Sequence, residues 1–302
     1  MSILVVGSVA YDTVETPLER RERQLGGSAS FFSLAASRFA PVRAVGVVGD
    51  DFRAADLDLL AARGVDTAGI VRRAGPTFHW AGRYHEDLIE RDTLATELGV
   101  FQDFAPELPA GWRETPYLFL ANIHPALQAD VLDLMAPPRL VVLDTMNLWI
   151  KTTRRELQDV LARVDVVLLN DGEARLLSGR RSLAAAAAAI RELGPARVVI
   201  KKGEHGALFF GRDSLLAVPA LLLPEVVDPT GAGDCFAGGF VGHLAAAGAS
   251  RDDGDGVFRR AMLAGTAVAS ACPEAFSVDG VLALDEAGYE RRLATLAAMM
   301  TP

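Results

Sequence analysis

The stretch VVDPTGAGDCFAGGF, residues 226–240, combines the residue types that phosphate chemistry needs. Gly231 and Gly233 allow a tight turn and let backbone N–H groups approach a ligand closely. The helical stretch that begins at Asp234 adds the positive end of a helix dipole, which favours anions such as phosphate. A carboxylate at this position can accept the proton of an attacking hydroxyl. The pattern predicts a site for phosphoryl transfer, in which positioning and charge stabilisation supply most of the catalysis.

The loop allows three other interpretations, two of which its glycine spacing argues against. Asp234 could simply be an acid in the first turn of a helix, where negative charge is favourable. The loop is not G-x-G-x-x-G, because the glycine after Gly233 is Gly238, and Gly7 at the end of the first strand lacks the other glycines too. A dinucleotide-binding dehydrogenase is therefore disfavoured, and the missing G-x-x-x-x-G-K-[ST] motif excludes a P-loop enzyme.

The elements that must position this loop alternate along the chain. Short apolar runs, typical of strands buried on both faces of a parallel sheet, alternate with longer helical patterns, which favours a three-layer α/β domain. The expected strands are Ile3–Val6, Ala44–Val48, Tyr117–Leu120, Leu140–Leu143, Val164–Leu169 and Val198–Lys201, with a further strand-like run at Leu221–Val227. The expected helices are Ser28–Arg38, Arg53–Ala62, Ala126–Met135, Arg154–Ala162, Glu173–Leu177, Ser182–Leu193, Asp234–Ala247, Val257–Ala271 and Asp285–Ala298.

Two segments, about 10–25 and 77–104, do not follow this alternation. We expect them to form a small β lid at one edge of the sheet, built from two separate parts of the chain. Phe78, Trp80 and Tyr84 would share one lid face, because side chains alternate along a strand. That face could cover an aromatic substrate group, or it could only pack the lid against the body or a second subunit.

Composition narrows the classes of partner. The chain has 302 residues and a formal net charge of −9, without the basic face of a nucleic-acid-binding protein. Gly, Pro or charged residues interrupt every apolar run, so no membrane span is expected. Cys235 and Cys272 have no metal-site spacing and are expected to be buried free thiols in a reducing compartment, the cytoplasm. The five histidines show no ligand spacing either.

Several motifs resemble those of one family. DPTGAGDCFAGGF, residues 228–240, resembles the C-terminal signature of the ribokinase-like family, the pfkB-type carbohydrate and nucleoside kinases. Gly26–Gly27 before a helix resembles the N-terminal signature of that family, and GDD at Gly49–Asp51 is also familiar there. NDGE, Asn170–Glu173, resembles the N-x-x-E motif, and KKGEHG, Lys201–Gly206, resembles the piece before the nucleotide site.

The resemblance extends from Ile3 to about Leu296. It implies a single ribokinase-like three-layer α/β/α domain over residues 1–302, with a mostly parallel central sheet and a small β lid. It also implies an ATP-dependent kinase that transfers the γ-phosphate to a hydroxyl, expected to be primary, of a small sugar or ribonucleoside. Asp234 would be the general base, and the N–H groups of Gly231, Ala232 and Gly233 would form the anion hole.

The resemblance implies further roles. Asn170 and Glu173 would organise Mg²⁺ and its waters near the ATP phosphates. The residues implied along the nucleotide are Lys201, Gly203, Gly206 and Thr230. The residues implied at the acceptor are Asp12, Gly26 and Gly27. Asp228, Thr230 and the backbone near Ser277 would surround a monovalent cation such as K⁺.

Each role has a structural rival. Asn170 with Glu173 also resembles a helix capping box, and Asp12 could be a turn residue. Gly26–Gly27 could be only a loop-to-helix turn, and Lys201 an exposed strand end.

The chain departs from the family pattern at Phe31, where the N-terminal signature usually has Asn. The departure weakens a simple ribose or fructose assignment, although Phe31 could equally belong to the core. Asn122 and Asn147 follow expected strands, so both could face the substrate or be ordinary turn residues. A non-catalytic metabolite sensor on a kinase scaffold is the alternative function, and an exposed lid edge could pair with a second subunit to form a homodimer.

Overall fold

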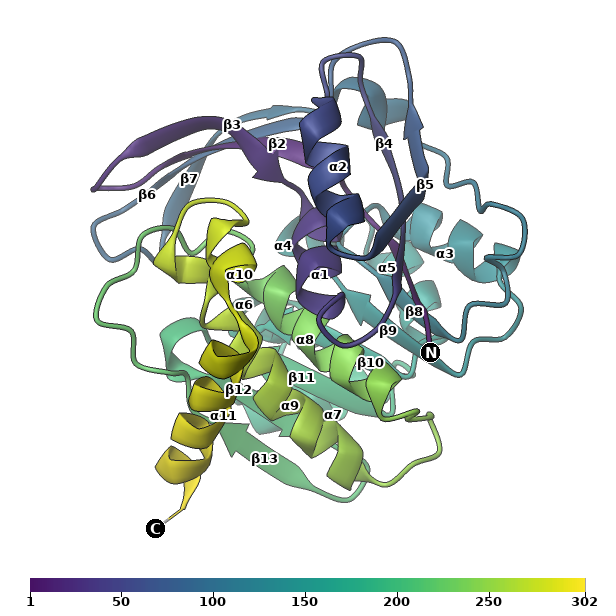
Figure 1. Ribbon diagram of the computed structural model, residues 1–302. Helices are drawn as coiled ribbons and strands as arrows, with labels where there is room; N and C mark the ends of the chain where they lie inside the picture. The colour runs from purple at the N-terminus through teal and green to yellow at the C-terminus, as the bar shows by residue number, and fades with distance from the viewer. Residues whose placement is uncertain (302) are drawn as a thin grey trace.

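A mostly parallel sheet forms the centre of the molecule (Figure 1). The computed structural model describes residues 1–301, and within them this sheet has nine strands in the order β13-β12-β11-β10-β9-β8-β1-β4-β5. The pairs from β5 to β11 are parallel, and β12 and β13 add an antiparallel edge. The strands are β1 (Ile3–Val6), β4 (Val42–Val48), β5 (Val65–Arg72), β8 (Tyr117–Leu120), β9 (Leu140–Asp144), β10 (Val166–Asn170), β11 (Arg197–Lys201), β12 (Ala207–Phe210) and β13 (Leu215–Val218).

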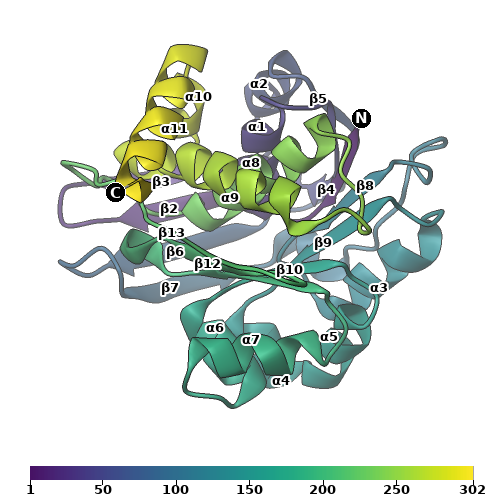
Figure 2. The same cartoon turned by 90° about the horizontal axis from the view of Figure 1, so that it is seen from below.

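Helices cover both faces of the sheet, as the view from below makes plain (Figure 2). On one side lie α1 (Ser28–Ala36), α2 (Ala54–Ala62), α8 (Ala232–Ala246), α9 (Asp255–Ala269), α10 (Asp279–Ala283) and α11 (Glu286–Met300). On the other lie α3 (Pro125–Leu134), α4 (Asn147–Thr152), α5 (Arg154–Leu161), α6 (Asp171–Ser178) and α7 (Leu183–Arg191).

Strand β1 shows why the sheet needs both helical layers. Ile3 and Val5 pack into the core beneath α1, α8 and α9, whereas Leu4 and Val6 pack into the core beneath α3, α5 and α7. All four side chains are fully buried. A continuous apolar run is the sequence signature of such a strand, and the expected three-layer α/β/α fold is confirmed.

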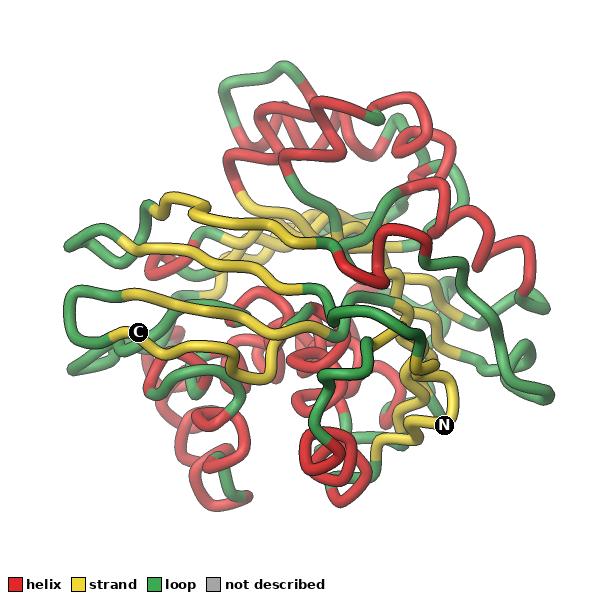
Figure 3. The backbone as a smooth tube through the Cα atoms, turned by 90° about the horizontal axis from the view of Figure 1, so that it is seen from above, coloured by secondary structure: helices red, strands yellow, loops and turns green. Residues whose placement is uncertain are grey.

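The lid is a separate sheet of four strands in the order β3-β2-β6-β7, within the part of the chain described (Figure 3). Its strands are β2 (Ala10–Glu15), β3 (Arg20–Gly26), β6 (His79–Tyr84) and β7 (Arg91–Glu97). The two hairpins come from distant parts of the chain and join through the parallel pair of β2 and β6. A lid made from two separate segments is therefore what the structure contains.

Helix α8 is held close to its neighbours by glycines. A Cβ on Gly238 would lie 2.6 Å from the carbonyl oxygen of Phe32 on α1, and one on Gly239 would lie 2.9 Å from that of Ala264 on α9. Only glycine lets the three helices approach this closely. This packing fixes the N-terminal end of α8 above the carboxyl edge of the sheet.

Some predictions from sequence were wrong. Leu221–Val227 is an extended loop rather than a strand, and the strand before it, β13, belongs to the antiparallel edge. The second lid segment ends at Glu97, because residues 99–103 form a short 3-10 helix and Phe104 behind it packs into the body core. Strand β5 was missed because polar residues interrupt its apolar pattern. No helix within residues 1–301 has the length and apolarity to cross a membrane.

Candidate active site

The glycine loop opens α8 as the sequence predicts. Gly231 is the N-cap with φ of 80°, a left-handed conformation that favours glycine, and Asp234 lies in the first turn. Among the described residues, the N–H groups of Gly231 and Gly233 have no acceptor, whereas that of Ala232 lies 3.3 Å from the carbonyl oxygen of Pro229. Unpartnered N–H groups at a helix N-terminus fit an anion.

The residues before the loop are anchored on both sides. The Asp228 carboxylate accepts hydrogen bonds from the N–H of Thr230 at 2.9 Å and from the N–H of Ser277 at 3.2 Å. The Cys272 thiol donates to the Thr230 carbonyl at 3.2 Å. Asp228 therefore links the backbone of the glycine loop to that of Ser277, a structural role that does not require a bound cation.

Phe31 is a core residue that also touches the loop. Its side chain is only 2% exposed. A Cβ on Gly231 would lie 2.4 Å from the Phe31 ring, so the ring packs directly on the loop backbone. Of the two roles left open by the sequence, burial supports core packing.

A buried ion pair lies beneath the loop. The Lys201 ammonium donates to the Asp144 carboxylate at 2.7 Å, from the ends of the strands β11 and β9. A Cβ on Gly233 would lie 3.2 Å from the Lys201 nitrogen, so the lysine reaches the glycine loop. The lysine side chain is only 17% exposed, and an exposed strand end is excluded.

Negative charge accumulates around Asp234. Burial, followed by the charge of Asp144, raises the pKa of Asp234 to about 8, and Lys201 and Arg91 offset part of the rise. Burial and Asp144 also raise the pKa of Glu173 to about 7. Crowded carboxylates of this kind favour a cation among them.

Asn170 and Glu173 form the capping box that the sequence allowed. The Glu173 N–H donates to the Asn170 side chain at 2.8 Å, and the Asn170 N–H donates to the Glu173 carboxylate at 2.7 Å. The box fixes the start of α6 at the carboxyl end of β10.

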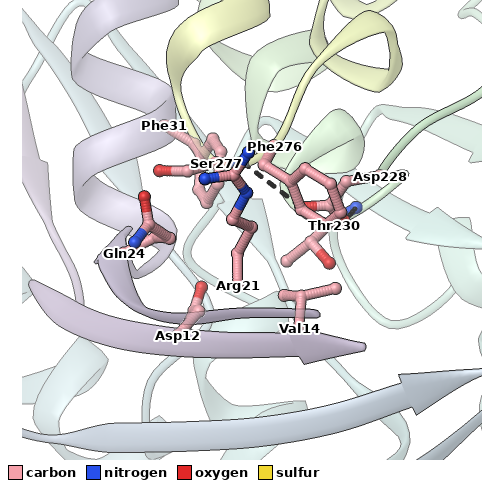
Figure 4. A pocket seen from close by; sticks show the side chains of 9 residues that line it. All are labelled: Asp12, Val14, Arg21, Gln24, Phe31, Asp228, Thr230, Phe276 and Ser277. Atoms are coloured by element: carbon pink, nitrogen blue, oxygen red, sulfur yellow. Dashed lines mark hydrogen bonds between the residues drawn. The ribbon is translucent and has the colours of Figure 1, made fainter. Parts of the chain in front are cut away.

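Asp12 lies in a small cavity between the lid and the body, with room for about one water molecule (Figure 4). A Cβ on Gly26 would lie 2.1 Å from the Asp12 carboxylate, so only glycine fits beneath it. Burial raises the pKa of Asp12 to about 7, although the N–H of Gly27 donates to it. The side chains around the cavity are those of Asp12, Val14, Arg21, Gln24, Phe31, Asp228, Thr230, Phe276 and Ser277.

The lid contacts the glycine loop directly. The Thr230 hydroxyl donates to the Tyr84 oxygen at 3.1 Å, and Tyr84 is 6% exposed. Trp80 and Tyr84 share the lid face toward the body, while Phe78 lies before the strand and stacks on Phe101. The prediction of one shared face therefore holds for Trp80 and Tyr84 but not for Phe78, which lies outside the strand.

Four other predicted residues follow the carboxyl ends of strands β8, β9 and β11. Trp149 donates its indole N–H to the Asn122 side-chain oxygen at 2.9 Å, and Asn147 is exposed at the start of α4. Gly203 and Gly206 form the turn after β11 with φ of 56° and 80°. No side-chain hydrogen bond in residues 1–301 joins either asparagine to Asp234 or Lys201.

Sequence reasoning missed Asp144, Tyr84 and Arg91. Asp144 directly follows the expected strand Leu140–Leu143, and an acid at the carboxyl end of a parallel strand is a signal that could have found it. Tyr84 was noted only as part of an aromatic pattern. Nothing local in the sequence marks Arg91, because its position depends on the pairing of β6 with β7.

The residues present fit Mg²⁺ bound jointly with phosphate. No group of three or more acidic, His or Cys side chains in residues 1–301 is arranged to hold a metal alone. Mg²⁺ commonly takes one or two protein carboxylates and completes its shell with water and substrate phosphates. The buried Glu173 carboxylate, with its raised pKa, suits that arrangement.

Comparison with known proteins gives matches in sequence to carbohydrate and nucleoside kinases. A family model described as pfkB family carbohydrate kinase matches residues 136–278. Cytidine kinase from Thermococcus kodakarensis is 32% identical over 249 residues, which cover 80% of this chain and 87% of that protein. A 2-dehydro-3-deoxygluconokinase from Thermoproteus tenax is 35% identical over 123 residues, 41% of this chain and 32% of that protein.

Solved structures match the fold over nearly the whole chain. A putative ribokinase II from E. coli, in complex with ATP and Mg²⁺, has a TM-score of 0.80 at 18% identity and covers 97% of this chain and 99% of its own. A nucleoside kinase from Burkholderia thailandensis, in complex with inosine, has a TM-score of 0.75 at 21% identity and covers 98% and 99%.

Proposed function

The chain belongs to the pfkB family of carbohydrate kinases, and we propose that it transfers the γ-phosphate of ATP to the primary hydroxyl of a ribonucleoside. Membership makes it a phosphotransferase that acts on a sugar or a nucleoside. The choice of a nucleoside rests on the relative from Thermococcus kodakarensis, a cytidine kinase that this chain matches over 87% of its length. Cytidine is therefore the first acceptor to test.

The observation that carries the proposal is the start of α8. Gly231 and Gly233 offer N–H groups without protein acceptors, and Asp234 lies in the same helical turn. Donors for a phosphoryl group thus stand beside a carboxylate that can take a proton. This is the arrangement that positioning and electrostatic catalysis of phosphoryl transfer require.

The reaction follows from these roles. Asp234 accepts the proton of the acceptor hydroxyl, whose oxygen attacks the γ-phosphorus while the bond to the departing ADP oxygen breaks. The N–H groups of Gly231 and Gly233 bind the phosphoryl oxygens, and Lys201 supplies positive charge beneath them. A general base works best when its pKa lies near the working pH, and a pKa of about 8 for Asp234 suits that role.

Other residues would bind the two substrates. Asn170 and Glu173 would hold Mg²⁺ through water, and Mg²⁺ would supply charge neutralisation at the phosphates. Gly203, Gly206 and Thr230 would lie along the nucleotide. The acceptor would contact Asp12, Gly26 and Gly27, with Asn122 and Asn147 as outer candidates.

The lid has to move for this reaction. The cavity at Asp12 has room for about one water molecule, far less than a nucleoside needs. Opening would break the contact of Tyr84 with Thr230, and closure would restore it. Closure over the substrates would also exclude water, which otherwise hydrolyses ATP.

The proposal has two further parts. A K⁺ ion binds beside the glycine loop, and two copies of the chain form a homodimer through their lids. Asp228, Thr230 and the backbone at Ser277 would surround the cation, and the edges of β3 and β7 could pair with a second copy. Adding K⁺ to the kinase assay should raise the rate, and light scattering should give twice the chain mass. An unchanged rate or a monomer mass would remove the corresponding part.

The test is acceptor-dependent ADP release from ATP and Mg²⁺. The acceptors are cytidine, adenosine, inosine, ribose, fructose and 2-keto-3-deoxygluconate, with 5′-deoxycytidine as the matched control. We expect release with a ribonucleoside and none with the 5′-deoxy compound, which lacks the primary hydroxyl. Release with sugars alone would overturn the nucleoside assignment, and ATP binding without any release would favour the metabolite-sensor alternative.

A further inference from the structure

One face of the lid is turned toward the glycine loop, residues 231–234. Residues paired across neighbouring strands point to the same face of a sheet. Asp12 on β2 pairs with Trp80 on β6, and Tyr84 on β6 pairs with Arg91 on β7. Asp12 lines the cavity beneath the lid, and Tyr84 contacts Thr230. Arg91 therefore belongs to the same inward face.

Two aromatic rings support the Arg91 side chain. Its guanidinium carbon lies 5.7 Å from the centre of the Trp80 ring and 6.0 Å from that of Tyr84. Both distances are within the range of a cation–π interaction. A Cβ on residue 82 would lie 2.2 Å from the Trp80 ring, so Gly82 lets that ring lie flat along the strand.

Apart from these two ring contacts, the Arg91 guanidinium has no polar partner in residues 1–301. Its side chain makes no ion pair or hydrogen bond with any residue from 1 to 301. Most other lid arginines are engaged: Arg20 and Arg21 pair with nearby glutamates, Arg23 with Asp51, and Arg83 with Glu15. A guanidinium that rests only on aromatic rings keeps its fork of donors available for a ligand.

The site below needs such a cation. Its buried or partly buried charges are mainly carboxylates: Asp12, Asp144, Glu173, Asp228 and Asp234. The ammonium of Lys201 is already paired with Asp144. ATP would bring further negative charge, and transfer of its terminal phosphoryl group requires that charge to be offset.

We propose that Arg91 is a phosphate-binding residue delivered by the lid, whose guanidinium binds oxygens of the transferred phosphoryl group when the lid closes over ATP. Cation–π contacts with the rings of Trp80 and Tyr84 hold it in position. The inference rests on the proposed kinase function.

Arg83 is the matched control. It lies on β6, on the opposite lid face, and donates two hydrogen bonds to the Glu15 carboxylate at 2.8 and 3.2 Å. Its exposure resembles that of a surface arginine, with a side chain 54% exposed. Arg83→Gln removes the same charge from the same lid without touching the inward face.

The first experiment compares the steady-state kinetics of Arg91→Gln, Arg91→Lys and Arg83→Gln with those of the wild type. Arg91→Gln should lower kcat by about 10²-fold, the usual loss for one donor to a developing charge. Arg91→Lys should recover part of that loss, because a lysine keeps the charge but not the planar fork. Arg83→Gln should stay within about twofold, as a surface substitution does. A kcat of Arg91→Gln within about threefold of wild type, or an equal loss in both glutamine variants, would overturn the proposal.

The second experiment does not depend on turnover. Calorimetry would measure the affinity of each variant for Mg²⁺-ADP with aluminium fluoride, a mimic of the transferred phosphoryl group, and for Mg²⁺-ATP. Arg91→Gln should bind the mimic at least tenfold more weakly than Arg83→Gln does. A tenfold change in affinity corresponds to about 1.4 kcal/mol of binding free energy. If the wild type phosphorylated no acceptor, the kinase proposal would fail. Equal affinities of the two glutamine variants for both ligands would separately overturn the role of Arg91.

Discussion

Asp234, the general base in our proposal, is subject to two opposing requirements. A base must be ionised to take a proton, yet burial and the charge of Asp144 raise its pKa to about 8. Lys201 and Arg91 act in the other direction. The result is a carboxylate that titrates near neutral pH, where a general base is most effective.

The titration of Asp234 should govern the pH dependence of the reaction. Only the ionised carboxylate accepts a proton, so kcat/KM for the acceptor should rise with pH, reach half its maximum near pH 8 and level off above that pH. The pH profile of kcat/KM reports groups of the free enzyme, which is the state described here. A profile that is flat between pH 6 and 8 would contradict the assignment of Asp234 as the base.

Among the individual site residues, the sequence predicts those of the glycine loop but not the side chains that other strands place around it. Gly231, Gly233 and Asp234 lie within one motif, so their relation is local and could be predicted. Asp144, Tyr84 and Arg91 come from three strands, β9, β6 and β7, whose meeting depends on the whole fold. Their types are visible in the sequence, but their proximity to Asp234 is not.

The start of α6 is an element with two candidate roles. The capping box of Asn170 and Glu173 satisfies backbone N–H groups that the helix leaves unpaired. The same Glu173 is 9% exposed and carries a pKa raised to about 7, which a cap alone does not require. A substitution that keeps the hydrogen bond and removes the charge separates the two roles.

Glu173→Gln is that substitution. Its amide oxygen can still accept from the Asn170 N–H, so the melting temperature should be unchanged or higher, because a buried charge is removed. If Glu173 helps to hold Mg²⁺, kcat should fall by roughly tenfold or more and the Mg²⁺ concentration for half-maximal rate should rise. Glu173→Ala is the control for the cap and should cost about 1 kcal/mol of stability. Full activity of Glu173→Gln at low Mg²⁺ would leave Glu173 as a cap only.

Elements with a clear period or a continuous apolar run could be predicted. Strands β1, β8 and β9 are buried on both faces, and their runs show it. Leu221–Val227 is equally apolar but lies in a loop that pairs with no strand within residues 1–301, and Leu222 is 83% exposed. Apolar composition therefore identified the buried strands but could not recognise a segment without a partner.

The whole molecule places its site where the direction of the sheet order reverses. After β1 the chain adds β4 and β5 on one side, and from β8 onward it adds strands on the other. Such a point leaves a crevice at the carboxyl ends of the strands, which is where ligands bind in open α/β sheets. Asp12 follows β1 and Asp144 ends β9, so the carboxylates gather at that crevice.

Gathering these carboxylates should make the whole protein less stable as pH rises. In the unfolded chain an Asp ionises with a pKa of about 3.9. In the folded chain Asp234 keeps its proton to about pH 8, and Asp12 and Glu173 to about 7. Between these values the folded state binds more protons, so the free energy of unfolding falls as pH rises.

Thermal unfolding from pH 5 to pH 8 measures this effect. The melting temperature of the wild type should fall over the range, and that of Asp234→Asn should fall less and be higher at pH 8 by roughly 2–4 °C. Asp133→Asn, which removes an exposed acid of α3, should follow the wild type. A wild-type melting temperature that rises from pH 5 to pH 8, or equal curves for Asp234→Asn and wild type, would contradict this explanation.

The most direct test of Asp234 as the general base is the turnover of Asp234→Asn with ATP, Mg²⁺ and the best acceptor. Glu286→Gln is the matched control, because it removes a first-turn acid from α11, whose Glu286 pairs with Arg38. We predict that Asp234→Asn lowers kcat by at least ~10²-fold, the low end for loss of a general base, while the control stays near wild type. A kcat of Asp234→Asn within a few-fold of wild type would contradict the assignment of Asp234 as the group that receives the proton of the acceptor.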